Sequence, residues 1–409
     1  MRLNTRRRRA VVRHGAQPLR FAVAASVVAL VAAACGSSGN ASSASSTTKP
    51  GSGAVSSSAT PITLPVIGDF TGSDAFFGTG QVAGMGPAIA ALNKSGGIGG
   101  HQLKLEQCDT QSTVSGAEQC ATKFASQPVV LAVSVIANLK AALPTLSNSV
   151  VLASTNLLNP PYSSNSFQVA PSGATVDDVV DQVAKASHFS TIGIIATDDA
   201  VGEAQLGFIK AAAGSLQLDT QFISASATDD TVAMQKLISA NVPMIYVAAL
   251  GAAGAAVIKA YDELKPKMPL VVTGADASYG FLKGISAYEP TSNFYTIPGT
   301  PLVPGDVPSS DAAKMSAYIS AAKASIGHAP DTINVSGAFA IDVAIALLKG
   351  AGLNSSMSAK EAWLHSNTIS ALTNVSYSNP KLNVLSNVPP GFDKISGTSF
   401  TSASMNLAS

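Results

Sequence analysis

From residue 61 onward, short runs of apolar and β-branched residues alternate with longer stretches whose apolar positions recur at helical spacing. The short runs form two series of four, at residues 62–68, 101–107, 129–136 and 150–154, and then at 191–197, 219–225, 243–250 and 269–276. Strands that alternate with helices of about 10–15 residues are typical of βαβ units and parallel sheets. The pattern therefore predicts an α/β fold with two doubly wound parallel-sheet lobes, one for each series.

Polar and small residues follow several of the predicted strands. In open parallel sheets, ligands bind outside the carboxyl ends of the strands. The candidate binding positions that follow from this rule are Asn138, Asn156 to Leu158, Val201, Ala249 to Gly251, and Asp276. Asn138 and Asp276 are also good helix N-cap residues, so capping alone is the alternative interpretation for either side chain.

Residues 1–34 have the pattern of a signal peptide, with a basic stretch followed by an apolar run from Phe21 to Ala34. This run is too short to span a bilayer as a permanent helix. Cys35 follows two small residues and precedes a polar segment, as in a bacterial lipobox, so we predict that it is lipidated. Simple cleavage that leaves a free thiol is the alternative. The arginine run leaves twin-arginine export open beside an ordinary basic leader.

Residues 36–60 contain ten serines, four glycines and no aromatic residue. Such a composition cannot bury a core, so we expect a disordered tether that spans about 25–30 Å. Residues 35–60 would then hold the folded body on the extracytoplasmic face of a cell membrane, through the lipid anchor.

The arginines are confined to the leader. All seven lie in the first twenty residues, which contain no acid, and the rest of the chain has 18 Lys against 24 Asp plus Glu. Nucleic-acid surfaces need clustered Lys and Arg, so we expect no nucleic-acid partner. Any carboxylate or phosphate bound by the folded part must be held by donors other than a guanidinium.

No set of catalytic or metal-binding residues is evident in the sequence. The five histidines are isolated from other ligand-type residues, and no GxSxG motif occurs. The glycines of residues 78–84 resemble a phosphate loop only loosely, and a tight loop with close helix packing is the simpler interpretation. The acid pairs at residues 198–199 and 229–230 are expected to start helices. We therefore expect no enzymatic activity, no metal and no cofactor.

Two cysteines, Cys108 and Cys120, remain once Cys35 carries a lipid. Export places them in an oxidising compartment. Cys108 ends a predicted strand and Cys120 lies in the second turn of the next predicted helix, an arrangement that suits a disulfide. We predict this bridge, and two buried thiols are the alternative.

Several short motifs between residues 62 and 111 occur together. They are Thr71-Gly72, the aromatic-glycine pair Phe77-Gly78, the run Leu92-Asn93-x-x-Gly96-Gly97-Ile98-x-Gly100, and Asp109 after the second strand. This set resembles the start of the branched-chain amino-acid (Leu/Ile/Val) binding proteins of ABC transporters, which have the type I periplasmic-binding-protein fold. The resemblance extends over about residues 61–300.

The resemblance implies two α/β lobes joined by a three-strand hinge, with one small solute bound between them on closure. It places the N-terminal lobe at residues 61–170 plus 299–373, and the C-terminal lobe at residues 171–298 plus 374–409. The implied partners are a small-molecule ligand and the membrane subunits of an ABC permease, and we expect a monomer.

The resemblance also implies roles for residues after the third and fourth strands. In the family, the helix after the third strand holds the ligand carboxylate at its start; the matching residues here are Asn138 and Leu139. The Asn138 amide would donate together with backbone N–H groups. The family's contacts after the fourth strand match Asn156, Leu157 and Leu158, and Leu158 replaces a threonine.

The remaining implied contacts come from both lobes. Asp276 matches the family's acid that pairs with the ligand ammonium, and Phe77 matches an aromatic wall. Val201 and Ala249 give the second lobe a smooth, weakly polar wall. These residues predict a ligand with an apolar side: a branched-chain or other amino acid, or else an amide, a short acid or an aromatic acid.

The sequence thus predicts an extracytoplasmic solute-binding lipoprotein of an ABC importer. An exported ligand sensor of the same fold is the runner-up, since the two share every feature named above. An exported hydrolase is disfavoured because no nucleophile–base set is present. A structural adhesin would explain the tether but not the doubly wound pattern.

Overall fold

The computed structural model describes residues 59–154, 163–171, 173–389 and 391–408. The predicted signal peptide, Cys35, nearly all of the tether and the predicted site residues Asn156, Leu157 and Leu158 lie outside the described residues.

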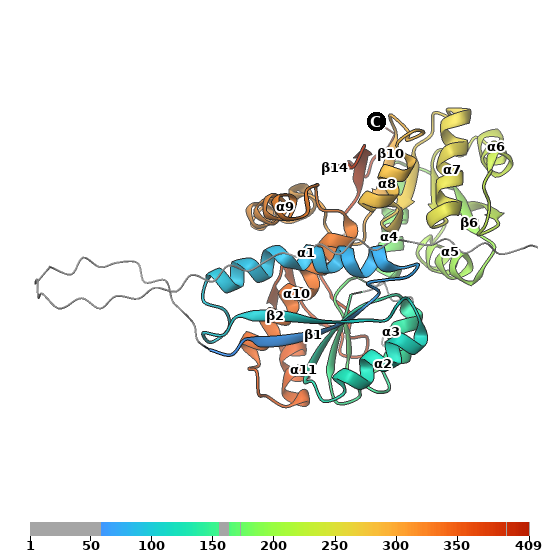
Figure 1. Cartoon of the computed structure of the whole chain (residues 1–409). Helices are drawn as coiled ribbons and strands as arrows, with labels where there is room; N and C mark the ends of the chain where they lie inside the picture. Colours follow the sequence, from blue (N-terminus) through green and yellow to red (C-terminus); the bar gives the residue numbers. More distant parts are fainter. Residues whose placement is uncertain (1–58, 155–162, 172, 390, 409) are drawn as a thin grey trace, which may run out of the picture. The chain divides into compact units, whose positions relative to one another are not determined.

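The first lobe is built on a five-stranded parallel sheet with the order β2-β1-β3-β4-β5. Its strands are β1 (Ile62–Gly68), β2 (Leu103–Asp109), β3 (Val129–Val133), β4 (Val150–Ala153) and β5 (Ser166–Gln168). Its helices are α1 (Ala75–Lys94), α2 (Val114–Phe124), α3 (Ile136–Ala142), α9 (Ala312–Ile326), α10 (Thr332–Gly350) and α11 (Met357–Ser366). Figure 1 shows α1 and α10 against the sheet, with α2 and α3 together beyond it.

Side-chain alternation along the strands divides the first lobe into two cores. Val129 and Leu131 of β3 pack with α1 and α10, whereas Val130 and Ala132 of the same strand pack with α2 and α3. Successive side chains of a strand point to opposite faces, so a strand covered on both faces is apolar throughout. This accounts for the uninterrupted apolar runs in the sequence.

Helices α1 and α10 touch backbone to backbone. A Cβ atom added at Gly84 of α1 would overlap the carbonyl oxygen of Asn334, and one added at Gly337 of α10 would overlap that of Gln81. Both helices are long and apolar enough by composition to cross a membrane, and here they pack against each other. Gly80 and Gly84 therefore serve close packing against α10, as predicted. The tight loop predicted for residues 78–84 is wrong, because these residues lie within α1.

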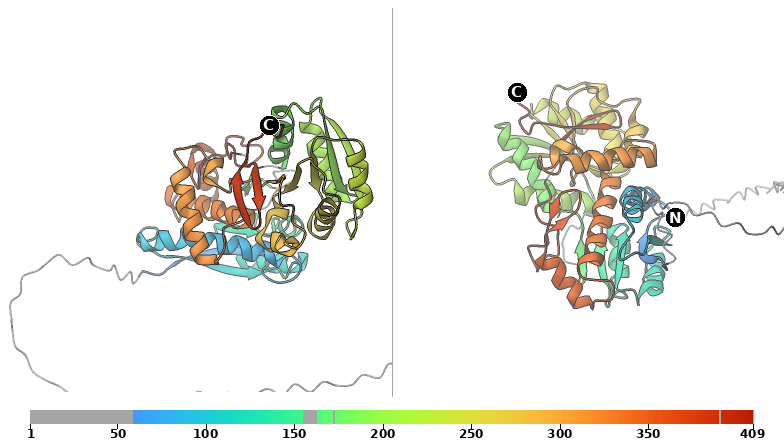
Figure 2. Two further views of the ribbon diagram at one scale, coloured as in Figure 1. Left: turned by 90° about the horizontal axis from the view of Figure 1, so that it is seen from above. Right: turned by 90° about the vertical axis from the view of Figure 1, so that its left-hand side faces the viewer.

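The second lobe is built on a seven-stranded sheet with the order β14-β13-β10-β9-β8-β6-β7 (Figures 1 and 2). Its strands are β6 (Thr191–Thr197), β7 (Gln217–Ile223), β8 (Ile245–Ala248), β9 (Leu270–Thr273), β10 (Phe294–Ile297), β13 (Asp393–Ser396) and β14 (Ser399–Ser402). Its helices are α4 (Gly173–Ala186), α5 (Ala200–Ala212), α6 (Thr231–Ser239), α7 (Gly251–Leu264) and α8 (Tyr279–Ile285). Strands β6 to β10 pair in parallel, and β13 and β14 extend the sheet as an antiparallel hairpin.

The chain passes between the two sheets three times, after β5, after β10 and after Val388. The parallel five-stranded sheet, the parallel strands β6 to β10 and the three connections confirm the predicted fold class. The third crossing comes later than residue 374, where the sequence placed it. Strand β12 (Asn374–Val375) pairs with β11 (Ile369–Ser370), and Val384 bridges Gln168 at the edge of β5. Residues up to Val388 thus cover an edge that would otherwise be open.

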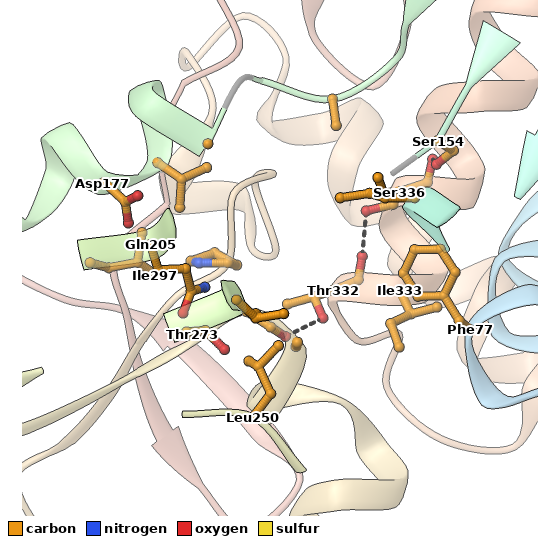
Figure 3. Close-up of a pocket in the computed structure, with 18 of the residues that line it drawn as sticks. Phe77, Ser154, Asp177, Gln205, Leu250, Thr273, Ile297, Thr332, Ile333 and Ser336 are labelled. Atoms are coloured by element: carbon orange, nitrogen blue, oxygen red, sulfur yellow. Dashed lines mark hydrogen bonds between the residues drawn. The ribbon is translucent and has the colours of Figure 1, made fainter. Parts of the chain in front are cut away.

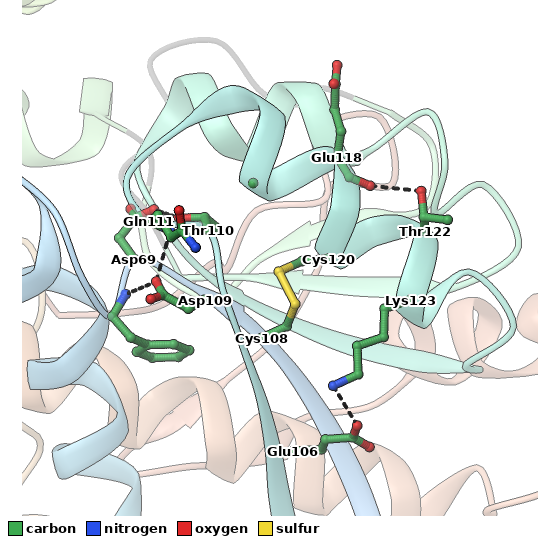
Figure 4. The surroundings of a disulfide bond; sticks show 12 residues. Asp69, Glu106, Cys108, Asp109, Thr110, Gln111, Glu118, Cys120, Thr122 and Lys123 are labelled. Atoms are coloured by element: carbon green, nitrogen blue, oxygen red, sulfur yellow. Dashed lines mark hydrogen bonds and ion pairs between the residues drawn. A yellow bond between two sulfur atoms is a disulfide. The ribbon is translucent and has the colours of Figure 1, made fainter.

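The disulfide is present as predicted, between Cys108 at the end of β2 and Cys120 of α2 (Figure 4). The two Cα atoms are 5.6 Å apart, within the usual range. The bridge ties α2 to the edge strand of the first sheet, where Lys123 and Glu106 also form an ion pair of 2.8 Å.

Replacing both cysteines by serine is expected to lower the free energy of unfolding by about 3 kcal/mol, because the short loop is then free in the unfolded chain. Urea unfolding of the folded body with and without reductant measures the effect. Reductant should bring the wild-type protein to the stability of the double variant and leave the variant unchanged. Equal stability of the oxidised wild type and the variant would refute a structural role for the bridge.

Candidate functional site

A cavity of about 260 Å³ lies between the two lobes, at the carboxyl ends of β4, β8, β9 and β10 (Figure 3). The first lobe contributes Phe77, Ile136, Ser154, Thr332, Ile333 and Ser336 to its wall. The second lobe contributes Val176, Asp177, Val201, Gln205, Tyr246, Leu250, Thr273 and Ile297. This is the place where parallel α/β sheets bind ligands, and its size suits one small molecule.

Asp177 is the only charged residue among the described residues that line the cavity. It lies in the second turn of α4, 4% exposed, and the Tyr246 hydroxyl of β8 donates a hydrogen bond to it. Burial raises the pKa of Asp177 to about 7, against the effect of the tyrosine bond. Burial, with the nearby Asp177 carboxylate as a smaller cause, also raises the pKa of Tyr246 well above its usual value. The carboxyl group is thus poised to gain or lose its charge near neutral pH.

Two further side chains present oxygen atoms that have no protein partner. Gln205 Oε1 of α5 and Thr273 Oγ1 at the end of β9 are buried and accept no hydrogen bond from any described residue. Figure 3 shows Gln205, Thr273 and Asp177 on the same side of the cavity. Buried polar atoms without partners are rare in folded proteins. Together with Asp177, they form an acceptor-rich wall on the second lobe.

The hydroxyl groups of the first-lobe wall are already used within the protein. Ser154 donates to the carbonyl oxygen of Ser336 at 3.3 Å, and Ser336 donates to that of Thr332 at 2.8 Å. Thr332 in turn donates to the carbonyl oxygen of Gly274 at 2.7 Å, across to the second lobe (Figure 3). The first-lobe side of the cavity is therefore mainly apolar contact surface.

Asp331 makes a second connection between the lobes. Its carboxylate caps α10 through the amides of Ile333 and Asn334, at 3.0 and 2.9 Å. The other carboxylate oxygen accepts from the amide of Tyr279 at the start of α8, at 2.7 Å. Burial raises the pKa of Asp331, and the hydrogen bonds from Tyr279 and Asn334 oppose this.

The predicted site residues fall into three groups. Phe77 and Val201 line the cavity. Asn138, Leu139, Ala249 and Asp276 are buried nearby but are not among its lining residues. The residues after β4, Asn156 to Leu158, lie outside the described part of the chain.

The amide of Asn138 donates to the carboxylate of Asp69, at 2.8 Å. Asp69 follows β1, is fully buried, and also accepts from Ser134 at 2.7 Å, from the Val135 amide at 2.8 Å and from the Thr110 hydroxyl. Asn138, Ser134 and Val135 all lie at the start of α3, where the resemblance implies a bound ligand carboxylate. In this structure a carboxylate of the protein itself receives these donors.

Asp276 has a comparable position at α7. Its Oδ1 atom accepts from the amide of Gly251, the first residue of α7, at 3.0 Å. It is 1% exposed, and burial raises its pKa to about 8. Asp276 thus caps α7, a helix that begins 25 residues earlier in the chain. The sequence offered helix capping as the alternative to ligand binding for this residue, but at a helix that follows it.

The predicted site residues did not include Asp177, Gln205, Tyr246 and Thr273. Thr273 ends a predicted strand and could have been found by the strand-end rule. Tyr246 lies inside an apolar run, where a residue of the core is expected. Asp177 and Gln205 lie inside amphipathic helices, where polar residues normally face the solvent. Only the packing of α4 and α5 against each other and against the second-lobe sheet brings these side chains together.

No group of three or more His, Cys, Asp or Glu residues in the described part of the chain is arranged to hold a metal ion. The acid pair at residues 198–199 starts α5, as predicted, because the Asp199 carboxylate accepts from the amides of Val201 and Gly202 at 3.1 and 2.9 Å.

The chain matches a family described as periplasmic binding protein over residues 61–388. No curated protein is significantly similar to it in sequence.

Solved structures of bacterial ligand-binding proteins share the fold. An extracellular ligand-binding receptor from Verminephrobacter eiseniae has 19% identity and a TM-score of 0.68, over 83% of this chain and 99% of that chain. The branched-chain amino acid transporter substrate-binding protein LivJ from Streptococcus pneumoniae, in complex with isoleucine, has 16% identity and a TM-score of 0.69, over 83% and 97%. A solute-binding protein of an ABC transporter from R. palustris, in complex with benzoate, has 13% identity and a TM-score of 0.65, over 84% and 95%. At these identities the likeness shows the fold alone.

Replacing Asp177 by asparagine is expected to stabilise the ligand-free protein at high pH. Because burial raises the pKa of Asp177 from 3.8 to about 7, the folded state holds its proton where the unfolded state has lost it. The free energy of unfolding therefore falls as pH rises from about 4 to about 7. Asp177→Asn removes this contribution, so the variant should exceed the wild type by up to about 4 kcal/mol at pH 8 and by little at pH 4.

Urea unfolding at pH 4, 6 and 8 tests this expectation. Asp178→Asn is the matched control, because Asp178 is the exposed neighbour on the same helix and should leave the pH profile unchanged. A wild-type profile in Asp177→Asn would contradict the environment assigned to Asp177.

Proposed function

The chain belongs to the periplasmic binding protein family, and on that premise we propose that it captures one small solute between its lobes and delivers it to an ABC permease. The observation that carries the proposal is the cavity itself. Both lobes contribute to its wall at the carboxyl ends of their strands, so a ligand there contacts both lobes at once.

Capture by closure follows from how the lobes are joined. Three crossings connect them, and Pro298 of the second crossing lines the cavity. Beside the cavity, Thr332 bonds to Gly274, and Asp331 bonds to the start of α8. A ligand that bonds to both walls would favour the closed arrangement by its differential affinity, and a permease could then distinguish loaded from empty receptor.

The wall composition supports a small amphipathic solute. Phe77, Ile136 and Ile333 of the first lobe offer apolar surface, and Asp177 and Gln205 of the second lobe offer acceptors. The solved relatives include one bound to isoleucine and one bound to benzoate. An amino acid was the ligand that the sequence resemblance favoured, and the wall itself requires only an apolar body with a polar head. The sensor alternative rests on the same features.

Attachment to the membrane through Cys35 is part of the proposal. The basic leader, the short apolar run and the small residues before Cys35 support it, as does membership of a family of periplasmic or extracytoplasmic binding proteins. The serine-rich tether would let the receptor meet its permease in many orientations.

Filling the mouth of the cavity is expected to abolish capture without unfolding the protein. Leu250 lines the cavity and is 38% exposed, so Leu250→Trp should block entry at little cost in stability. In a thermal-unfolding screen of amino acids, amines, amides and small acids, a solute at 100 times its dissociation constant adds about 2.7 kcal/mol of stability to the wild type.

Leu250→Trp should lose this stabilisation. Val232→Trp is the matched control, because Val232 is 68% exposed and does not line the cavity. It should respond to the solute as the wild type does. Equal stabilisation of all three proteins would contradict binding in this cavity.

Replacing Cys35 by alanine is expected to release the protein from the membrane. The wild type should incorporate labelled palmitate in its native host and partition into detergent, whereas Cys35→Ala should do neither. The double Cys108→Ser, Cys120→Ser variant controls for the other thiols and should keep the label. Membrane association that survives in Cys35→Ala would disprove lipidation at this residue.

A further inference from the structure

Helices α3, α5, α7 and α10 begin at the wall of the cavity, and so does α4, whose first residue, Gly173, lines it. Ile136 of α3, Val201 of α5, Leu250 just before α7 and Thr332 of α10 each line the cavity from the first turn or the cap. The N–H groups and the dipole of a helix N-terminus attract anions, so these helix starts would ordinarily be the places to hold a ligand carboxylate.

Apart from the start of α4, each of these helix starts already binds an aspartate of the protein. Asp69 receives donors at α3, and Asp199 at α5. Asp276 receives the first amide of α7, and Asp331 receives the first amides of α10. A ligand carboxylate would have to displace one of these side chains or lie beside it, where an ionised aspartate is a like charge.

Asp69 shows how complete this occupation is. Four donors reach its two carboxylate oxygens, one each from Thr110, Ser134, Val135 and Asn138. The side chain of Asp69 is fully buried. A Cβ atom added at Gly78 of α1 would overlap the backbone carbonyl oxygen of Asp69, so α1 covers this residue closely. The donors that the sequence resemblance assigned to a ligand are therefore not available to one.

No positive side chain compensates for the lost anion sites. The described residues that line the cavity include no Lys, Arg or His. Residues 155–162 and 172, which lie outside the described part of the chain, contain none in the sequence either. Three groups that can accept a hydrogen bond face the cavity without a full set of partners: the Asp177 carboxyl, Gln205 Oε1 and Thr273 Oγ1, whose hydroxyl hydrogen is directed at Asp276.

We infer that the ligand is a small amine, protonated at neutral pH, with an apolar body and without a carboxylate. Its ammonium group lies against the second-lobe wall and pairs with Asp177. Gln205 Oε1 and Thr273 Oγ1 accept the remaining N–H groups, which satisfies the two unpartnered oxygens. Its apolar body packs against Phe77, Ile136 and Ile333. This inference rests on the proposed function and specifies the chemical class that the cavity selects.

The charge state of Asp177 gives the inference a second observable. Because burial raises its pKa to about 7, part of the ligand-free protein carries a proton there at neutral pH. An ammonium beside the carboxylate favours the ionised form, so binding releases protons. The groups that face Asp177 are the Tyr246 hydroxyl and, through Tyr246, the Asp276 carboxyl. Amine affinity should therefore fall as pH is lowered from 8 to 6.

Isothermal titration calorimetry with three matched probes tests the inference. The probes are 3-methylbutylamine, leucine and 4-methylpentanoate, which share one branched body and differ in carrying an ammonium, both charges or a carboxylate. We expect the amine to bind at least tenfold more tightly than either other probe. Asp177→Asn should weaken it at least tenfold and should abolish the proton release, measured as the dependence of the enthalpy on buffer ionisation.

Two variants identify the residue that acts. Asp69→Asn should leave amine binding within about twofold, because Asp69 serves α3 and not the cavity. Asp276→Asn separates the two candidate acids: loss of amine binding there, with binding kept in Asp177→Asn, would overturn the assignment. Unfolding curves of each variant without probe show that the folded state is retained.

The outcomes also separate this inference from the proposed function. Tight binding of leucine or 4-methylpentanoate, unaffected by Asp177→Asn, would overturn the amine class and leave solute capture standing. If the three probes do not bind, the charge of the best solute from the thermal screen decides: a carboxylate-bearing solute overturns the inference, and a cationic one supports it. A screen without any stabilising solute would overturn capture and the amine class together.

Discussion

Carboxylates of the protein that cap helix N-termini organise the region between the two lobes. Asp69, Asp199, Asp276 and Asp331 each come from a loop that follows a strand or precedes a helix, and each closes the start of a helix that borders the cavity. A buried carboxylate is costly unless donors surround it, so these bonds fix the loops that carry them. The same bonds take up N–H groups at the starts of α3, α5, α7 and α10.

Asp331 links this capping to the movement of the lobes. One carboxylate oxygen caps α10 of the first lobe and the other receives the Tyr279 amide of the second lobe. Thr332, the next residue, bonds to Gly274, so two neighbouring residues make both hydrogen bonds described between the lobes beside the cavity. Any opening must break or stretch these bonds, while the glycine contact between α1 and α10 keeps the first lobe itself rigid.

The sequence predicted the fold and the disulfide because both follow from local pattern. Apolar runs such as β3 and β4 are covered on both faces, and the spacing of Cys108 and Cys120 spans one strand end and one helix turn. The third crossing was misplaced because residues 376–388 are polar and extended, and only their pairing with Gln168 assigns them to the first lobe. Phe77 and Val201 line the cavity, and their binding role stays a prediction. Asp177 could not be found, because an acid inside an amphipathic helix normally marks the solvated face.

The aspartates at the helix starts change what the confinement of arginine to the leader implies about the charge of the ligand. Taken alone, a folded body without guanidinium groups suggests that a ligand carboxylate rests on helix N-termini. The structure places aspartates at the starts of α3, α5, α7 and α10, and the described lining residues include no Lys, Arg or His. Asp177 is the one charged group among the described lining residues, and in its ionised form it is best paired with a positive charge on the solute. A binding protein with an acidic body and no cation at its cleft is built to recognise the amine end of a molecule.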